Sequence, residues 1–341
     1  MKKNIVPIVL FILLIFCITS YITIFSSNTS LKQNTKIIIP SNTKKDDLLS
    51  ILNPFLDNEI SFKITANLKG YFNNIRYGVY TLERGMSNND IVNKLRLRSE
   101  GINVTFNNVN SIEELVSLVS NQIETDSLSL IQSFKDSSFL KENSFNEDNL
   151  MSMYIPNTYN VYWNSTADEF RNRMLKEYHR FWNNTRLEKA KNIGLDPKEV
   201  YSLASIVNKE SIKVDERPRI SGVYLNLLRI GEKLRADPTV IYSLRKKSNN
   251  PNLIIKRVLY KDLEVDSPYN TYKYKGVPPG PICMPDMSSI LSVLNPEKHD
   301  YYFFVVDIEN FGYHVFSSSL EEHNRNKSKY IRWINNQGIY R

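Results

Sequence analysis

The residue in this chain best suited to proton transfer is Glu210, in the segment SLASIVNKES (202–211). Four apolar residues precede it at the i, i+3, i+4, i+7 spacing of one helix face: Val200, Leu203, Ala204 and Val207. At about 100° per residue, Glu210 falls about 20° from Leu203, at the edge of the apolar stripe. A carboxyl group there is partly desolvated, which raises its pKa. A glutamic acid still protonated near neutral pH is what general acid catalysis requires.

A structural role is the alternative explanation for the carboxylate of Glu210. Glu210 would then pair with Arg217, Arg219 or a lysine near the helix end, and the helix alone favours this interpretation over catalysis. Glu216 is a second candidate acid, but it lies past the apolar stripe beside Arg217. We therefore expect Glu216 and Arg217 to form an ion pair.

Two predicted helix starts position the candidate site residues. Asp196 as N-cap, Pro197 in the first turn and Glu199 at the third position predict the start of the helix that carries Glu210. In LRADPTVIYSL, Asp237 followed by Pro238 predicts another helix with Asp237 as its cap.

The remaining segments of the C-terminal half have simple interpretations. Residues 167–192 predict one long helix, and the aromatic run 153–163 predicts a buried strand and loop, or alternatively a platform for a sugar ring. Residues 267–285, SPYNTYKYKGVPPGPICMP, are a loop with stiffening prolines and turn glycines. Residues 301–306 predict a buried strand, and 313–334 a strand followed by a helix.

Upstream, residues 36–120 predict a small α+β module of three β–α units. Strand-like runs at 36–39, 78–83 and 104–106 each lead to a capped helix. The predicted cap and acidic third residue of these helices are Thr43 and Asp46, Ser87 and Asp90, and Asn110 and Glu113. Coincidence among common capping patterns is the alternative.

The N-terminus predicts a membrane anchor. Residues 5–25 carry no charge and are long enough to cross a bilayer as a helix. Lys2 and Lys3 precede them, so residues 1–4 are expected to be cytoplasmic and the remainder to lie on the outer side of the membrane. A cleaved signal peptide is the alternative, although its apolar region is normally shorter. Residues 26–35 are polar and predict a linker.

Composition narrows the function classes. The 341 residues carry a formal charge of +8, which suits an anionic membrane face, an acidic polymer or simply a basic surface. The Lys and Arg residues are dispersed, so no nucleic-acid patch is predicted. Neither CxxC nor HExxH spacing occurs, so we expect no metal and no cofactor. Cys17 lies in the first apolar run, which makes a disulfide with Cys283 implausible.

Several motifs in order resemble the YceG-like (MltG) family of membrane-anchored endolytic murein transglycosylases. They are LASIVNKES, ERPRISGVYLNLL, LRADPTVIYSL, SPYNTYKYKGVPPGPI, NPEKHDYYFFV and YHVFSSSLEEHN. The resemblance covers at least residues 150–334 and extends loosely to the N-terminal segments. It implies an α+β fold made of a transmembrane helix, a small LysM-like β–α module (36–120) and a mixed α/β YceG-like catalytic domain (121–341).

In the family motif xKE[ST] the catalytic glutamate falls on Glu210. Many relatives have a glutamate also at the position of Asn208, so that position is not the essential acid here. Asn157 stands where relatives often have an aspartate, which weakens any role for a carboxylate at that position.

The resemblance implies cleavage of the β-1,4 bond between N-acetylmuramic acid and N-acetylglucosamine within peptidoglycan strands. Glu210 would protonate the leaving oxygen and then take the proton of the muramic C6 hydroxyl as it attacks C1, giving a 1,6-anhydro end. The substrate supplies the nucleophile, so no second carboxylate is required. Cell-wall synthases are implied partners, and termination of strand growth is the implied role.

Supporting residues for substrate binding are expected in three regions. They are Asn226; Asp237, Thr239, Asn270, Thr271 and Tyr272 in the second helix start and the polar loop; and His314, His323 and Asn324 near the C-terminus. Each has a structural alternative as a cap, a loop hydrogen bond or a brace.

Two rival functions remain open at this stage. A muramidase would hydrolyse the same bond and leave reducing ends, usually with a second carboxylate. A non-catalytic anchored peptidoglycan-binding module would keep its cellular role without Glu210.

Overall fold

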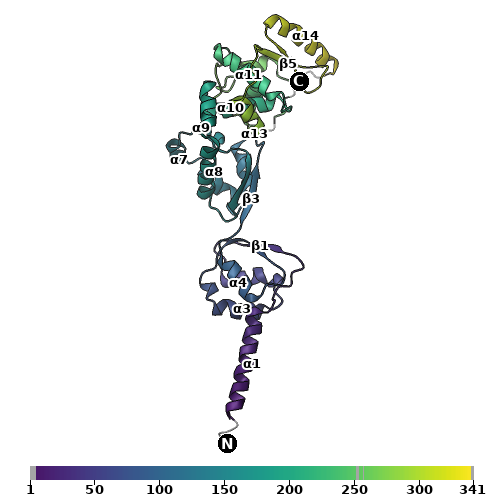
Figure 1. Ribbon diagram of the computed structural model, residues 1–341. Helices are drawn as coiled ribbons and strands as arrows, with labels where there is room; N and C mark the ends of the chain where they lie inside the picture. The colour runs from purple at the N-terminus through teal and green to yellow at the C-terminus, as the bar shows by residue number, and fades with distance from the viewer. Residues whose placement is uncertain (1–4, 251–252, 256, 339–341) are drawn as a thin grey trace. The chain divides into compact units, whose positions relative to one another are not determined.

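The computed structural model describes residues 5–250, 253–255 and 257–338, and the chain divides into two compact units (Figure 1). The first comprises the described residues up to Val104 together with Ser120–Asp126 and Tyr159–Thr166, and the second comprises the others. The units therefore divide the chain differently from the expected ranges 36–120 and 121–341. Residues 1–4, expected to be cytoplasmic, lie outside the described part.

The first unit follows a helix–strand–helix–helix–strand–helix order. Its elements are α1 (Ile5–Phe25), β1 (Thr35–Ile39), α2 (Lys45–Leu52), α3 (Glu59–Leu68), β2 (Gly78–Leu82) and α4 (Asn88–Arg96), with 3-10 turns at Asn53–Phe55 and Tyr71–Asn73. Strands β1 and β2 pair antiparallel, with Ile37 opposite Tyr80 and Ile39 opposite Gly78. Alternation along β1 buries Ile37 and Ile39 and leaves Ile38 exposed.

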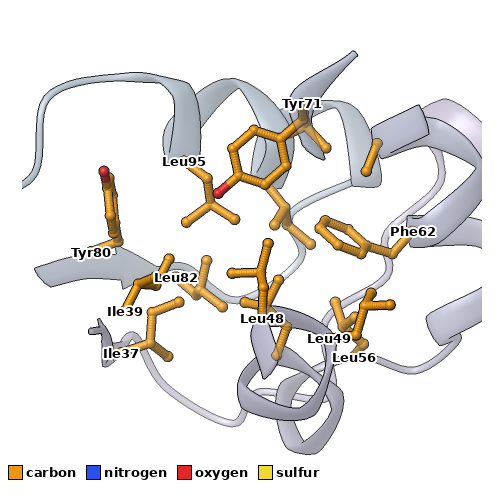
Figure 2. Packing of buried hydrophobic residues seen from close by; sticks show 14 residues of the cluster. Ile37, Ile39, Leu48, Leu49, Leu56, Phe62, Tyr71, Tyr80, Leu82 and Leu95 are labelled. Carbon is orange, nitrogen blue, oxygen red and sulfur yellow. The ribbon is translucent and has the colours of Figure 1, made fainter. Parts of the chain in front are cut away.

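The core of the first unit lies between this strand pair and the helices (Figure 2). Figure 2 shows side chains from both strands and from α2, α3 and α4 converging: Ile37, Ile39, Leu48, Leu49, Phe62, Leu82 and Leu95, with Tyr71 among them. None of the short elements has an apolar face large enough to be stable alone, so the unit depends on this shared core.

The predicted helix caps are correct for one helix and displaced for two. Ser87 and Asp90 form the expected capping box of α4. Helix α2 starts one residue late, because the Thr43 hydroxyl donates to the Pro40 carbonyl instead of capping. In the third case Ser111, not Asn110, accepts the backbone N–H of Glu114. Adjacent polar residues compete for the cap, and the sequence pattern does not decide between neighbours.

The expected linker 26–35 is instead packed into the first unit. Asn28 and Thr29 are buried, and Ser27 and Thr29 form isolated bridges to Ser87 and Leu56. Asn28 is the centre of a polar cluster described below. The segment predicted to be a linker thus packs against the unit, because the side chains of Asn28 and Thr29 satisfy buried backbone groups.

The second unit is mostly helical. Its helices are α5 (Ile112–Ser120), α6 (Ser127–Phe134), α7 (Ser137–Glu142), α8 (Ala167–Phe181), α9 (Asn184–Asn192), α10 (Pro197–Glu210), α11 (Arg217–Arg229), α12 (Asp237–Ser248), α13 (Met287–Leu294) and α14 (Leu320–Asn336), with 3-10 turns at Leu150–Met153 and Tyr260–Glu264. Strands β5 (Phe303–Val306) and β6 (His314–Ser317) pair antiparallel. Strands β3 (Gly101–Phe106) and β4 (Asn157–Tyr162) form another two-stranded sheet, whose residues are divided between the two units.

Two predictions for the second unit need correction. The long helix expected at 167–192 is broken into α8 and α9, because the side chain of Asn183 accepts the backbone N–H of Arg186 and starts a new helix. The strand at 301–306 exists as β5, but its residues are only half-buried. In the aromatic run 153–163, Tyr154 and Tyr159 are buried in the protein core.

Helix α10 is the central element of the second unit. It starts with the predicted Asp196 capping box and packs against α9, α11, α12 and α13 (Figure 1). Every residue from Val200 to Val207 is buried, so the helix has no solvent-facing side there. The surrounding helices therefore bring several chain segments to its C-terminal end, where Glu210 lies.

Candidate active site

Glu210 is the last residue of α10, and its side chain is held by one tyrosine. The Tyr224 hydroxyl donates a hydrogen bond of 2.5 Å to Oε1 of Glu210. Tyr224 lies on α11 and is buried, and its ring packs edge-on against Phe304 of β5 at 5.8 Å. Among the described residues, Tyr224 alone hydrogen-bonds to this carboxyl group, which leaves Oε2 available.

The surroundings of Glu210 raise its pKa to about 7. Desolvation is the largest cause, because it penalises the charged form. The hydrogen bond from Tyr224 acts in the opposite direction, the negative charge of Asp237 raises the pKa further, and His314 lowers it. The residue is only half-buried by solvent exposure, so the carboxyl group is desolvated but not sealed off. A protonated acid with one accessible oxygen is suited to proton donation.

A second carboxylate, Asp237, is bound by Tyr272. The Tyr272 hydroxyl donates a hydrogen bond of 2.6 Å to Oδ1 of Asp237. Desolvation raises the pKa of Asp237, opposed by Tyr272 and Lys327, although part of the residue remains exposed to solvent. The predicted cap is wrong: Asp237 is the first residue of α12, Ala236 holds the N-cap position, and neither side chain caps the helix. The carboxyl group is turned to Tyr272 instead.

His314 and Glu216 form a buried pair near the same site. The backbone N–H of His314 donates to Oε1 of Glu216 at 2.7 Å, and Nδ1 lies 2.8 Å from Oε2. Glu216 is buried. The predicted Glu216–Arg217 ion pair is therefore wrong, because β6 brings His314 to Glu216 whereas the Arg217 side chain points to α13.

Arg217 holds the turn that follows Glu210. Its Nε donates to the carbonyl of Ser211 at 3.0 Å, and Nη1 contacts both carboxylate oxygens of Asp286 at 2.8 and 2.6 Å. Arg217 is buried, and Asp286 is the N-cap of α13. The turn after the catalytic candidate is thus connected to the start of α13 by a charge-assisted contact.

The polar loop is anchored to α12 by buried threonines. The hydroxyls of Thr239 and Thr271 lie 2.9 Å apart, and Thr271 Oγ1 also accepts the backbone N–H of Ala236. Asn270 donates to the carbonyls of Leu263 and Val265. All three predicted residues are buried and make structural contacts. Their effect on the site is to position Tyr272 against Asp237.

Hydroxyls on α10 hold the proline-rich part of the loop. Ser202 donates to the carbonyls of Pro278 and Gly280, and Ser205 accepts the backbone N–H of Ile282. Gly280 lies so close to the backbone of Asp148 that a Cβ would come within 1.8 Å of its carbonyl oxygen. Near the end of α10, Asn208 Oδ1 accepts the backbone N–H of Asp286.

Three predicted residues lie apart from the Glu210 contacts. Asn226 donates to the carbonyls of His299 and Tyr301 and accepts from Arg229, so its side chain braces the approach to β5. The His323 ring stacks on Phe303 at 5.1 Å, and burial lowers its pKa. Asn324 is exposed on α14.

Sequence reasoning did not find Tyr224, the nearest partner of Glu210. Tyr224 lies on the buried side of α11, where a tyrosine is an ordinary core residue. Its neighbours in the sequence carry no signal that its hydroxyl meets a carboxylate from another helix. Charge patterning near Glu216 likewise pointed to Arg217 and not to the distant His314.

Comparison with known proteins places these residues in a family. A model of the YceG-like family matches residues 37–329. The endolytic murein transglycosylase of Bacillus subtilis (strain 168) is 30% identical over 319 residues, 88% of this chain and 86% of that protein. The enzyme of the same name from Streptococcus pneumoniae is 30% identical over 181 residues, 52% of this chain and 31% of that one.

A solved structure has a similar fold. The crystal structure of a YceG-like protein from Listeria monocytogenes matches 86% of this chain and 99% of its own, with a TM-score of 0.55 and 25% identity. The family model matches most of the chain, including α10 and the segments that surround Glu210, so the protein belongs to the YceG-like family.

Proposed function

We propose that this chain is an endolytic murein lytic transglycosylase, which cleaves the bond between N-acetylmuramic acid and N-acetylglucosamine within peptidoglycan strands. The Bacillus and Streptococcus relatives bear the name of that activity. The observation that carries the assignment to a site is the carboxyl group of Glu210, whose pKa is raised to about 7 and whose Oε2 is available. The activity needs one group that is an acid first and a base second.

In the proposed reaction Glu210 gives the proton on Oε2 to the glycosidic oxygen, and the bond from that oxygen to C1 of the muramic residue breaks. The C6 hydroxyl oxygen of the same residue then bonds to C1, and its proton passes to the Glu210 carboxylate. No water is consumed, and the acid is regenerated. The products are a 1,6-anhydro muramic end and a free 4-hydroxyl on N-acetylglucosamine.

The neighbours of Glu210 have distinct roles in this proposal. Tyr224 occupies Oε1 and so reserves Oε2 for both proton transfers. Asp237 keeps Glu210 protonated before the first step, because its charge disfavours a second anion nearby. His314 counters this effect and favours the carboxylate formed after that step. We assign Tyr272 to the wall of the site and Asn270, Thr271 and Thr239 to the buried contacts that hold its loop. Asn226, His323 and Asn324 are included only as outer residues.

The anchor and the N-terminal unit fit the same proposal. Residues 6–25 of α1 have a mean hydropathy of 2.8, and none of this window is buried in the protein. We propose that α1 crosses the cytoplasmic membrane once, with the N-terminus inside and the rest of the first unit and the second unit outside. The strand–helix–helix–strand order of β1, α2, α3 and β2 supports a LysM-like unit that contacts glycan. Elongating cell-wall synthases are the proposed partners, whose strands the enzyme would terminate.

The deciding experiment is a digest of purified glycan strands by the full chain in detergent and by its Glu210→Gln variant, with mass spectrometry of the new ends. We expect anhydro ends from the parent and a rate about 10²–10⁴-fold lower from the variant. Glu297→Gln, which removes an exposed ion-pair partner of Arg219, is the matched control and should keep full activity. Reducing ends would identify a muramidase. Equal yields of anhydro ends from parent and Glu210→Gln would refute the assignment of Glu210, and an absence of new ends from both proteins would support the non-catalytic binding module.

A further inference from the structure

Helix α3 in the first unit exposes a continuous apolar stripe. Ile60, Ile64 and Leu68 are 71%, 46% and 72% exposed, respectively. Their i, i+4, i+8 spacing puts them on one side of the helix. The opposite side buries Phe62 and Ala66 in the core shown in Figure 2. Single exposed apolar residues are ordinary, but three in a row on one helix need a partner surface.

A buried asparagine cluster fixes the start of α3 against the end of α1. Asn88 Nδ2 donates to the carbonyl of Thr23, in the last turn of α1, at 2.8 Å and to Oγ of Ser61 at 2.9 Å. Asn28 donates to Oδ1 of Asn88 at 2.6 Å and also exchanges hydrogen bonds with the backbone of Asn58, the N-cap of α3. One side chain thus bridges α1 and α3, so the first turn of α3 is held at the last turn of α1.

The hydrogen bonds between α1 and α3 determine how deep the apolar stripe of α3 lies relative to the bilayer. An apolar helix of 20 residues fills the hydrocarbon core, so its last turn lies at the boundary between lipid tails and headgroups. Tyr21, whose ring lies 5.2 Å from that of Phe25 near that end, is of a residue type enriched at this boundary. The first turn of α3 is held at the same depth by the asparagine cluster. Lys63, exposed and one residue from Ile64, suits the phosphate of a lipid headgroup.

We infer that Ile60, Ile64 and Leu68 rest in the outer interfacial layer of the lipid bilayer, so that α3 attaches the first unit to the membrane surface beside α1. The occupant of the stripe is lipid, because Asn88 holds the first turn of α3 against the last turn of the proposed membrane helix α1. The inference rests on the proposed membrane anchor and adds a second contact to it. Because α3 also contributes to the core of the first unit, the side of that unit that faces the membrane is rigid.

The test places a fluorescent NBD label in the full chain reconstituted in phosphatidylcholine–phosphatidylglycerol nanodiscs and measures quenching by doxyl-labelled lipids. In a Cys17→Ser background, the label is attached at Ile60→Cys, Ile64→Cys or Leu68→Cys. The matched control is Ile38→Cys, because Ile38 has the same side chain and is 45% exposed on β1. Cys283 is buried and does not compete for the label. A label on native Cys17, within α1, reports insertion of the anchor.

We expect quenching at least threefold stronger at the three α3 positions than at position 38, with the shallow headgroup-proximal quencher most effective. Quenching at Cys17 without excess quenching on α3 would overturn the inference and leave the anchor intact. An absence of quenching at Cys17 as well would also contradict the proposed membrane anchor. A blue-shifted, lipid-insensitive signal on α3 that appears only with two chains per nanodisc would assign the stripe to a second copy and also overturn the inference.

Discussion

The Tyr224 hydroxyl lies 2.5 Å from Oε1 of Glu210 and joins the buried face of α11 to the last residue of α10. A hydroxyl that donates to one carboxyl oxygen leaves the acidic proton on the other. In the proposed reaction the contact therefore selects which oxygen of Glu210 faces the glycosidic bond, and it does so before substrate binds. In an acid that must also act as a base, this keeps both proton transfers on the same atom.

Replacing Tyr224 with phenylalanine should move the pH profile upward. The hydrogen bond from Tyr224 lowers the pKa of Glu210, so its loss raises that pKa above about 7. The basic limb of kcat/KM is expected to shift by about one pH unit, and kcat to fall about tenfold because the carboxylate is less well stabilised. Tyr201→Phe, which removes the hydroxyl of another buried tyrosine that donates to the Tyr154 carbonyl, is the control. An unchanged pH profile for Tyr224→Phe would show that the contact is only structural.

Replacing Asp237 with asparagine should shift the basic limb of the kcat/KM profile to lower pH. The charge of Asp237 raises the pKa of Glu210, and asparagine removes that charge while its Oδ1 still accepts the Tyr272 hydroxyl. Activity near pH 7 is expected to fall about threefold to tenfold, because less Glu210 is protonated. Rates measured from pH 5 to 8.5 check this, and recovery of activity at acidic pH distinguishes the electrostatic effect from damage to the fold. A basic limb displaced to higher pH would contradict the assignment.

Glu210 should also make stability depend on pH. Its folded pKa is about 7 against an ordinary 4.5, so between these values folding takes up a proton and stability falls as pH rises. Glu210→Gln removes this loss. Relative to the parent, the variant should gain roughly 2–3 kcal/mol in unfolding free energy between pH 4 and pH 8. Denaturant unfolding in detergent at both pH values measures it, and a parent–variant difference that is constant with pH would refute it.

The Arg217–Asp286 contact should be important for stability. Arg217→Met leaves Asp286 without its ion pair and the Ser211 carbonyl without its donor. We expect a loss of about 3 kcal/mol, because breaking a largely buried pair strands one charge. Arg325→Met, which breaks an exposed pair with Glu321 on α14, should cost under about 1 kcal/mol. Equal losses for the two variants, measured by denaturant unfolding, would show that the buried pair contributes no more to the free energy of unfolding than the exposed pair.

Local sequence signals predicted those elements whose stabilising contacts lie close in the sequence. The Asp196 capping box starts α10 as expected, and the Ser87–Asp90 box starts α4. The long helix at 167–192 was wrong because Asn183, an ordinary polar residue within a helical pattern, caps a second helix there. The polar composition of residues 26–35 predicts a linker and does not reveal that Asn28 fits a buried cluster formed with Asn58 and Asn88.

Helical periodicity is a local property, so the sequence is enough to predict that Glu210 ends a helix whose preceding residues are buried. The sequence also predicts the apolar N-terminal helix, through length and lack of charge. The groups that surround the carboxyl group are known only from the packed fold: Tyr224 from α11, Asp237 with Tyr272, and His314 with Glu216. These partners are separated from Glu210 along the chain and converge because several helices and a strand pair pack around α10. No spacing rule predicts such contacts, since they depend on how whole elements pack.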